Sequence, residues 1–294
     1  SSLRTEAINS SAQHGPEDIA LVGKRNVPAL MTNWGFKQLC SRLRSPADFI
    51  GELPASLASH VLNHRLKEYG DKHDTVNLLF HNNGSFLCRA FTSDKYSRIW
   101  NWEVAERLLE LEQKGWEPAR PDIRVSMGDF PALYASDHDM FAFVRSNSAR
   151  IAEPGNPEGL QRGVIVENSE VGASALKLTR FLYREMCGNH IIWGASKVLE
   201  ISVRHVGNAR ERFNDYRYEL KRYAESSANE DEAKIASAKT VVIADTKEGV
   251  LDRLFGMRSL SLSRKTLEAG YDAVNTIQDG APNTVWGIVQ GLTR

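Results

Sequence analysis

The sequence predicts an α+β protein in which an antiparallel, hairpin-rich sheet with packed helices is followed by a mainly helical C-terminal part. An asparagine-glycine turn flanked by apolar alternation predicts a β-hairpin, and the β-branched run Val164–Val166 predicts a buried strand. From residue 195 onward, apolar side chains recur every three or four residues, as in amphipathic helices. With 294 residues, 41% of them hydrophobic, the chain is long enough for a substantial core in one large domain or two smaller ones.

The N-terminal quarter divides into a polar stretch and a helical layer. Residues 1–25 are polar and poor in aromatic side chains, so we expect a flexible arm. Residues 34–69 have helical periodicity, with Pro46 near a helix start and Gly70 after a helix end. The arm is expected to precede an α+β body that spans residues 26–194.

The middle of the chain alternates between strand and helix patterns. The stretch “VNLLFHNNGSFLCRAFT” predicts the hairpin around Asn82-Asn83-Gly84, and “NWEVAERLLELEQKG” predicts an amphipathic helix that ends at Gly115. Residues 122–146 are expected to be extended. A loop is expected at 153–159, and the segment from Leu176 favours a strand over a helix.

Residues 195–294 are expected to form a helical part that packs on the body as one unit. Apolar residues from Leu199 to Tyr223 predict one long helix, interrupted only by Gly207. The polar stretch “SSANEDE” predicts a hinge. Three shorter helices are then expected in “AKIASAKTVVIA”, “GVLDRLFGM” and “RKTLEAGYDAV”, before “NTVWGIVQGLTR”.

Composition and motif searches narrow the function classes. Lysine plus arginine and aspartate plus glutamate both number 37, so any nucleic-acid site must be a local patch. The three cysteines are far apart and lack CxxC spacing, which favours the cytoplasm of a bacterial host cell. No apolar run is long enough to span a membrane, and phosphate-loop, dinucleotide-binding and serine-hydrolase motifs are absent from the sequence.

Four acidic residues are the candidate ligands of a divalent metal, Mg²⁺ or Mn²⁺: Asp137, Asp139, Glu167 and Glu170. They occur in “SDHDMF” and “VENSEVG”, and a metal site requires that the two stretches meet in space. Aspartates also favour turns because their side chains bond to nearby backbone, and the turn interpretation is favoured over the metal. No cofactor is therefore expected.

Two other pairs have structural interpretations that outweigh the chemical ones. His60 and His64 have the i, i+4 spacing of a zinc pair, but the glutamate of HExxH is absent, so packing or surface hydrogen bonding is favoured. Cys187 and His190 resemble a thiol nucleophile and its base, yet a cysteine in an apolar setting more often belongs to the core.

The predicted long helix is the best candidate for contact with nucleic acid. Basic side chains alternate there with tyrosines, as in surfaces on which bases stack. Acidic residues are also interspersed, so a solvated face with internal ion pairs is the favoured structural alternative. The candidate nucleic-acid-binding residues are Arg204, Arg210, Arg212, Arg217, Tyr218, Lys221 and Arg222.

Several stretches together resemble the domain-of-unknown-function 932 family, the phage- and plasmid-like proteins. In order they are “LCSRLRSPADFIGELPASLASHVLNHRL”, “RAFTSDKYSR”, “LYASDHDMFAFV”, “GVIVENSEVGASALKLTRFLYREMCGNHIIWG” and “NTVWGIVQGLTR”. The resemblance runs from about residue 35 to the end, and “NSEVG” is its most specific block. It implies association with mobile genetic elements. It assigns no activity and carries over no catalytic residue.

Three functions remain open at this point. The first is a non-enzymatic protein of a phage, plasmid or other mobile element that binds single-stranded DNA in recombination or replication. The second is a structural protein that forms a homo-oligomer through the long helix. The third is a metal-dependent nuclease or phosphoesterase, and an enzyme is the less favoured class.

Overall fold

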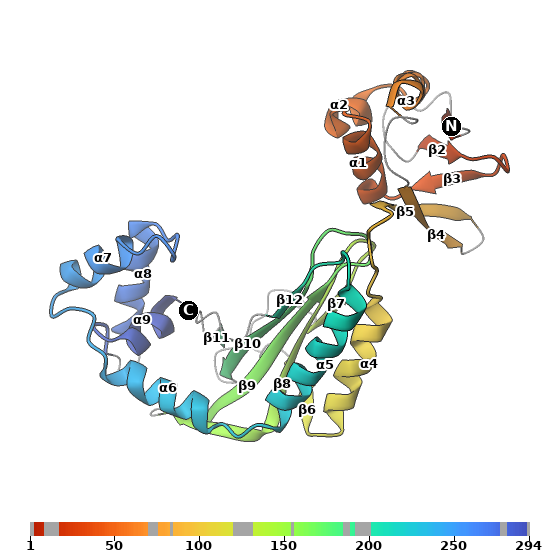
Figure 1. Cartoon of the computed structure of the whole chain (residues 1–294). Helices are drawn as coiled ribbons and strands as arrows, with labels where there is room; N and C mark the ends of the chain where they lie inside the picture. The colour runs from red at the N-terminus through yellow and green to blue at the C-terminus, as the bar shows by residue number, and fades with distance from the viewer. Residues whose placement is uncertain are drawn as a thin grey trace.

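The computed structural model describes residues 3–8, 18–69, 76–82, 85–119, 132–153, 156–184, 189–191, 201–276 and 281–292. Figure 1 shows an N-terminal α/β unit, a central sheet covered by two helices, and a group of C-terminal helices. The predicted α+β class is confirmed. None of the helices in these ranges is both long and apolar enough to cross a membrane.

The N-terminal unit packs three helices against a five-stranded sheet. Its strand order is β1-β2-β3-β5-β4, with β3 parallel to β5 and the other neighbours antiparallel. The core between helices and sheet includes Leu21, Phe36, Leu62 and Phe91. The strands are β1 (Arg4–Ala7), β2 (Ile19–Val22), β3 (Pro28–Met31), β4 (Val76–Asn82) and β5 (Phe86–Ser93), and the helices are α1 (Asn33–Arg42), α2 (Ala47–Glu52) and α3 (Ala55–Tyr69).

The expected flexible arm at residues 1–25 contains two strands of this sheet. All four residues of β2 are buried, and β1 pairs with β2 along its whole length. The polar composition of residues 1–18 hid the short apolar run Ile19–Val22, which needs the sheet as a partner. The predicted hairpin is confirmed by the antiparallel pair β4 and β5, although Asn83 and Gly84 lie outside the described residues.

The central sheet is antiparallel and is built around the long hairpin of β8 and β9. Its strand order is β11-β10-β9-β8-β6, while β12 also pairs with β10 and β7 also pairs with β8. The strands are β6 (Trp116–Pro118), β7 (Leu133–Ala135), β8 (Met140–Glu153), β9 (Asn156–Asn168), β10 (Leu176–Arg184), β11 (Asn189–Ile191) and β12 (Ile201–Val203). The predicted strands at Val164–Val166 and from Leu176 are thereby confirmed.

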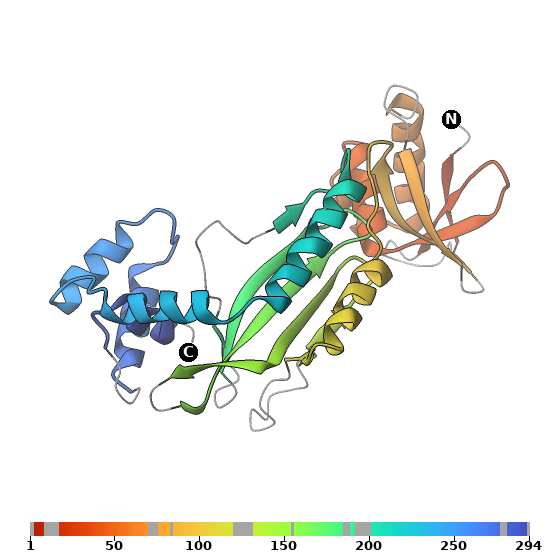
Figure 2. The same cartoon turned by 60° about the horizontal axis from the view of Figure 1, so that its bottom comes forward.

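Helices α4 (Asn101–Glu112) and α5 (Ala209–Glu225) lie side by side on one face of this sheet (Figure 2). Alternation along the strands sends Val144, Val164 and Leu178 toward these helices, where they join a shared core. The opposite face of the sheet carries a smaller apolar cluster that includes Ile165 and Phe181.

The predicted long helix from residue 199 is wrong over its first part. Ile201–Val203 forms β12, which pairs with Leu176–Leu178 of β10. Gly207 adopts a positive φ of 63°, and helix α5 begins only at Ala209. Apolar residues keep the three-to-four spacing of a helix through this segment. Its β-branched residues Ile201 and Val203, however, alternate with period two, as in a strand.

Four further helices complete the C-terminal part, which confirms its predicted helical character. The predicted hinge “SSANEDE” is replaced from Asn229 onward by the first turn of α6, where three acidic side chains suit the positive helix N-terminus. Ile235 and Trp286 pack on Ile151 and Leu160 at one end of the central sheet. The helices are α6 (Asn229–Thr240), α7 (Lys247–Phe255), α8 (Arg264–Val274) and α9 (Val285–Leu292).

Candidate functional sites

Helix α5 turns its apolar stripe inward and its basic residues outward. Phe213, Tyr216, Leu220 and Tyr223 pack on the central sheet of the same chain. This stripe, the predicted oligomer interface, is therefore already used within the chain. The seven predicted nucleic-acid-binding side chains are exposed, and Tyr218 has an exposed fraction of 66%.

The basic residues of α5 do not all have the same surroundings. Arg210 forms an ion pair with Glu103 of α4, and Arg222 forms one with Glu219. Arg210, Arg217 and Lys221 follow a spacing of seven and four residues, so they lie on the side of α5 that faces α4. Within the described ranges, four of the predicted side chains form no ion pair: Arg204, Arg212, Arg217 and Lys221.

The segment 168–172 joins the central sheet to the N-terminal unit. Val171 accepts hydrogen bonds through its carbonyl oxygen from Trp34 Nε1 and Gln38 Nε2 of α1, at 3.1 and 2.8 Å. Ser169 Oγ accepts from the backbone N–H groups of Val171 and Ala173. Gly172 has a φ of 85°, which a glycine adopts without strain. The turn interpretation of this block therefore agrees with the geometry.

Glu170 is a buried carboxylate that receives two different donors. Arg89 Nη1 of β5 lies 3.0 Å from Oε2, and the backbone N–H of Asn101 lies 2.8 Å from Oε1. Asn101 begins α4, so the negative charge also suits the positive end of that helix. Arg98 Nε donates to the Glu170 carbonyl oxygen at 2.7 Å. The carboxylate thereby connects the N-terminal unit, α4 and the central sheet.

A buried histidine, His205, lies close to Arg98 in the same part of the fold. The His205 ring stacks on Tyr96 with centroids 5.2 Å apart, and Nδ1 accepts from the Ile99 N–H at 3.4 Å. Burial, helped by the nearby Arg98 charge, lowers the pKa of His205 from 6.5 to about 4. The ring is therefore neutral at pH 7.

The four predicted metal ligands do not converge on one point. Asp139 Oδ1 accepts from Ser136 Oγ at 2.6 Å inside the turn between β7 and β8, and Asp137 lies 3.3 Å from His138 Nδ1. Glu167 pairs with Lys177 across β9 and β10 at 3.5 Å. Among the described residues, no three His, Cys, Asp or Glu side chains are grouped to hold a metal ion. The geometry thus gives the Mg²⁺ or Mn²⁺ hypothesis no support.

The other predicted pairs have ordinary surroundings. His60 Nδ1 lies 2.9 Å from the Ser56 carbonyl oxygen, and His64 Nε2 lies 3.4 Å from Glu68, as surface hydrogen bonding predicts. Cys187 lies outside the described residues. Burial raises the pKa values of the Cys40 and Cys88 thiols to about 12, so both stay protonated and unreactive at neutral pH.

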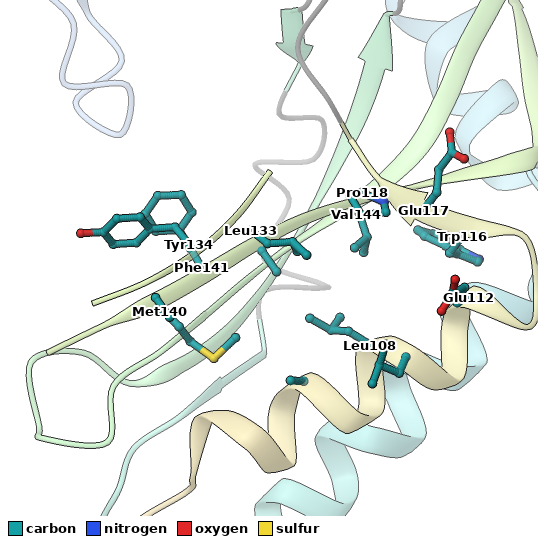
Figure 3. Close-up of a pocket in the computed structure, with 14 residues that line it drawn as sticks. Leu108, Glu112, Trp116, Glu117, Pro118, Leu133, Tyr134, Met140, Phe141 and Val144 are labelled. Atoms are coloured by element: carbon teal, nitrogen blue, oxygen red, sulfur yellow. The ribbon is translucent and has the colours of Figure 1, made fainter. Parts of the chain in front are cut away.

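An open apolar groove lies between α4 and the edge of the central sheet (Figure 3). It encloses about 440 Å³ and is lined by Leu108 and Leu109 of α4 and by Met140 and Val144 of β8. Trp116 closes one end, beside Glu112. Sequence analysis missed this groove because its walls come from three separate segments, each with ordinary amphipathic patterning.

The polar junction at Glu170 was also missed in part. Arg89, Arg98 and His205 carry no motif, and their roles depend on contacts across 72 or more residues of sequence. The only available signal was the “NSEVG” block itself.

The fold and these sites define a class: an α+β protein whose antiparallel sheet carries two parallel helices on one face and joins an N-terminal α/β unit through a buried carboxylate. A family model described as “Domain of unknown function (DUF932)” matches residues 90–294. Because this match covers more than half of the chain, the protein belongs to that family. The resemblance noted before residue 90 lies outside the match. Searches of curated proteins and of solved structures found no significant match.

Proposed function

We propose that this protein is a non-enzymatic binder of single-stranded nucleic acid and that α5, with the residues leading into it, forms the binding surface. The observation that carries the proposal is the set of four exposed cations without an ion-pair partner in the described ranges, Arg204, Arg212, Arg217 and Lys221. Tyr218 is exposed among them and offers a ring on which a base can stack.

The charge distribution favours nucleic-acid binding of moderate affinity, confined to the surface of α5. A cation without an ion pair binds a phosphate without breaking an existing interaction. Arg210 and Arg222 must first break their ion pairs with Glu103 and Glu219. The acidic residues of α4 repel a phosphate backbone, so they keep the affinity moderate on the side of α5 that carries Arg217 and Lys221. We further propose that such binding serves recombination or replication of a phage, plasmid or other mobile element, in line with the resemblance noted above.

The test measures the fluorescence anisotropy of a labelled oligothymidylate at low ionic strength. The wild-type protein is expected to bind, and the triple variant Arg212→Gln, Arg217→Gln, Lys221→Gln is expected to bind at least about tenfold more weakly. Tyr218→Ser is expected to weaken binding by about fivefold or more through lost stacking.

A matched control removes three exposed cations elsewhere. Lys24, Arg25 and Lys265 are exposed and likewise form no ion pair in the described ranges, so their replacement by glutamine makes the same change in net charge. This control is expected to bind as the wild type does. Equal loss in both triple variants would show that only net charge matters, and it would contradict a site on α5.

A further inference from the structure

The groove beside α4 extends the helix-covered face of the central sheet toward its edge. Met140, Ala142 and Val144 point to the same face as the residues under α4 and α5, and Ala105 and Leu108 of α4 form the other wall. The groove lies between α4 and the edge of the sheet that β6, β7 and β8 form.

The rim of the groove exposes large apolar side chains. Leu109, Leu133 and Tyr134 have exposed fractions of 62%, 52% and 41%. Trp102, one heptad before Leu109 on the same side of α4, is 58% exposed. Exposed apolar side chains gathered around a groove mark a site of protein contact more often than scattered single ones do.

The two ends of the groove are acidic. Glu112 lies beside Trp116 at one end and forms no ion pair within the described ranges, while Arg145 already neutralises the neighbouring Glu117. Asp137 and Asp139 lie at the other end, in the turn that leads into Met140, where they flank His138. Helix α4 itself carries four glutamates against a single arginine.

We propose that this groove docks an amphipathic helix of a partner protein that carries basic side chains near both ends. Apolar side chains of that helix fill the space between α4 and β8 and complete a three-helix layer over the sheet. The groove extends along Met140–Val144 of β8, whose four steps of about 3.4 Å each cover about 14 Å. A helix of about 12 residues spans that distance, and its lysines or arginines meet Glu112 and the aspartates.

The test uses a fluorescein-labelled amphipathic peptide of leucine and lysine, about 12 residues long, and a matched peptide with glutamate in place of lysine. The full chain is expected to bind the lysine peptide and not the glutamate peptide. Leu109→Asn is expected to weaken binding at least about fivefold because it removes a rim contact. The double variant Glu112→Gln, Asp137→Asn is expected to weaken binding similarly and to reduce its salt dependence.

Two controls distinguish this groove from other surfaces. Leu57→Asn removes another exposed leucine, 50% exposed on α3, and is expected to change nothing. The α5 triple variant described above is also expected to bind the peptide normally, so this test stands apart from the nucleic-acid proposal. Equal binding of both peptides, or binding of the lysine peptide that Leu109→Asn leaves unchanged, would overturn the docking proposal.

Discussion

Glu170 and Glu167 differ in what surrounds them, although they lie three residues apart. The Glu170 side chain is 10% exposed and pairs with Arg89, while the Glu167 side chain is 42% exposed and pairs with Lys177. Removing one partner of a buried pair leaves an uncompensated charge, whereas an exposed pair contributes little.

Replacing Glu170 by glutamine therefore destabilises the protein, and replacing Glu167 does not. We expect Glu170→Gln to lower the free energy of unfolding by about 2–4 kcal/mol. Glu167→Gln is the matched control and is expected to change it by less than about 1 kcal/mol. Urea unfolding followed by circular dichroism measures both. Equal effects would contradict the assigned roles.

His205 makes stability depend on pH. Its pKa is lowered from 6.5 to about 4, so the unfolded chain takes up the proton more readily than the folded one. The stability this ring contributes is complete above about pH 6.5 and is lost as the pH falls toward 4. We expect a loss of about 2–3 kcal/mol across this window.

His205→Gln should flatten that part of the profile. The measurement is the free energy of unfolding of both proteins at intervals between pH 7 and pH 4. Other groups contribute equally to the two curves, so their difference isolates His205. Parallel curves would show that His205 has the same pKa in the folded and the unfolded chain, which would contradict its assigned burial effect.

Sequence alone could not separate these residues. It identified the “NSEVG” block as a turn, because serine, glycine and acidic side chains are typical of turns. It did not reveal that Glu170 is buried, since the partner Arg89 lies 81 residues away. Such a contact is a product of tertiary folding and leaves no local pattern.

At the scale of elements, close packing between β9 and β10 explains why position 163 is a glycine. A Cβ atom added to Gly163 would lie 2.4 Å from the Phe181 ring, and Phe181 is only 1% exposed. Either the ring or the strand must then move. We expect Gly163→Ala to destabilise the protein by about 1–3 kcal/mol in urea unfolding.

A second substitution tests this cause. Phe181→Leu removes the ring edge and should restore part of the stability lost in Gly163→Ala, so that the two effects are not additive. Additive losses would mean that the glycine is needed for another reason.

The elements with the clearest local signals were predicted correctly, but turn-rich composition misled at 153–159, where β9 begins at Asn156 although a loop was expected. The Asn-Gly hairpin and α4 carry turn and capping residues in the sequence itself. β12 carries only Ile201 and Val203, and its pairing with β10 outweighs the helical spacing around it. Likewise, the buried strand Ile19–Val22 follows a polar segment and depends on two neighbouring strands.

At the scale of the whole molecule, charge is balanced but unevenly distributed. Lysine plus arginine equals aspartate plus glutamate at 37 each, yet α4 is acidic, and four cations that form no ion pair in the described ranges lie on and just before α5. Composition predicted that a nucleic-acid site would have to be a local patch. The fold adds that α4 lies beside this patch and neutralises Arg210.

The salt dependence of single-stranded DNA binding tests the central claim most directly. The logarithm of the association constant is plotted against the logarithm of salt concentration for the wild type and for the Arg212, Arg217, Lys221 triple glutamine variant. The slope is negative, and each lost phosphate contact makes it shallower by about 0.7. We therefore expect the magnitude of the variant's slope to be smaller by about 2. A wild-type protein that shows no salt-sensitive binding, or a variant with an unchanged slope, would contradict a nucleic-acid-binding surface on α5.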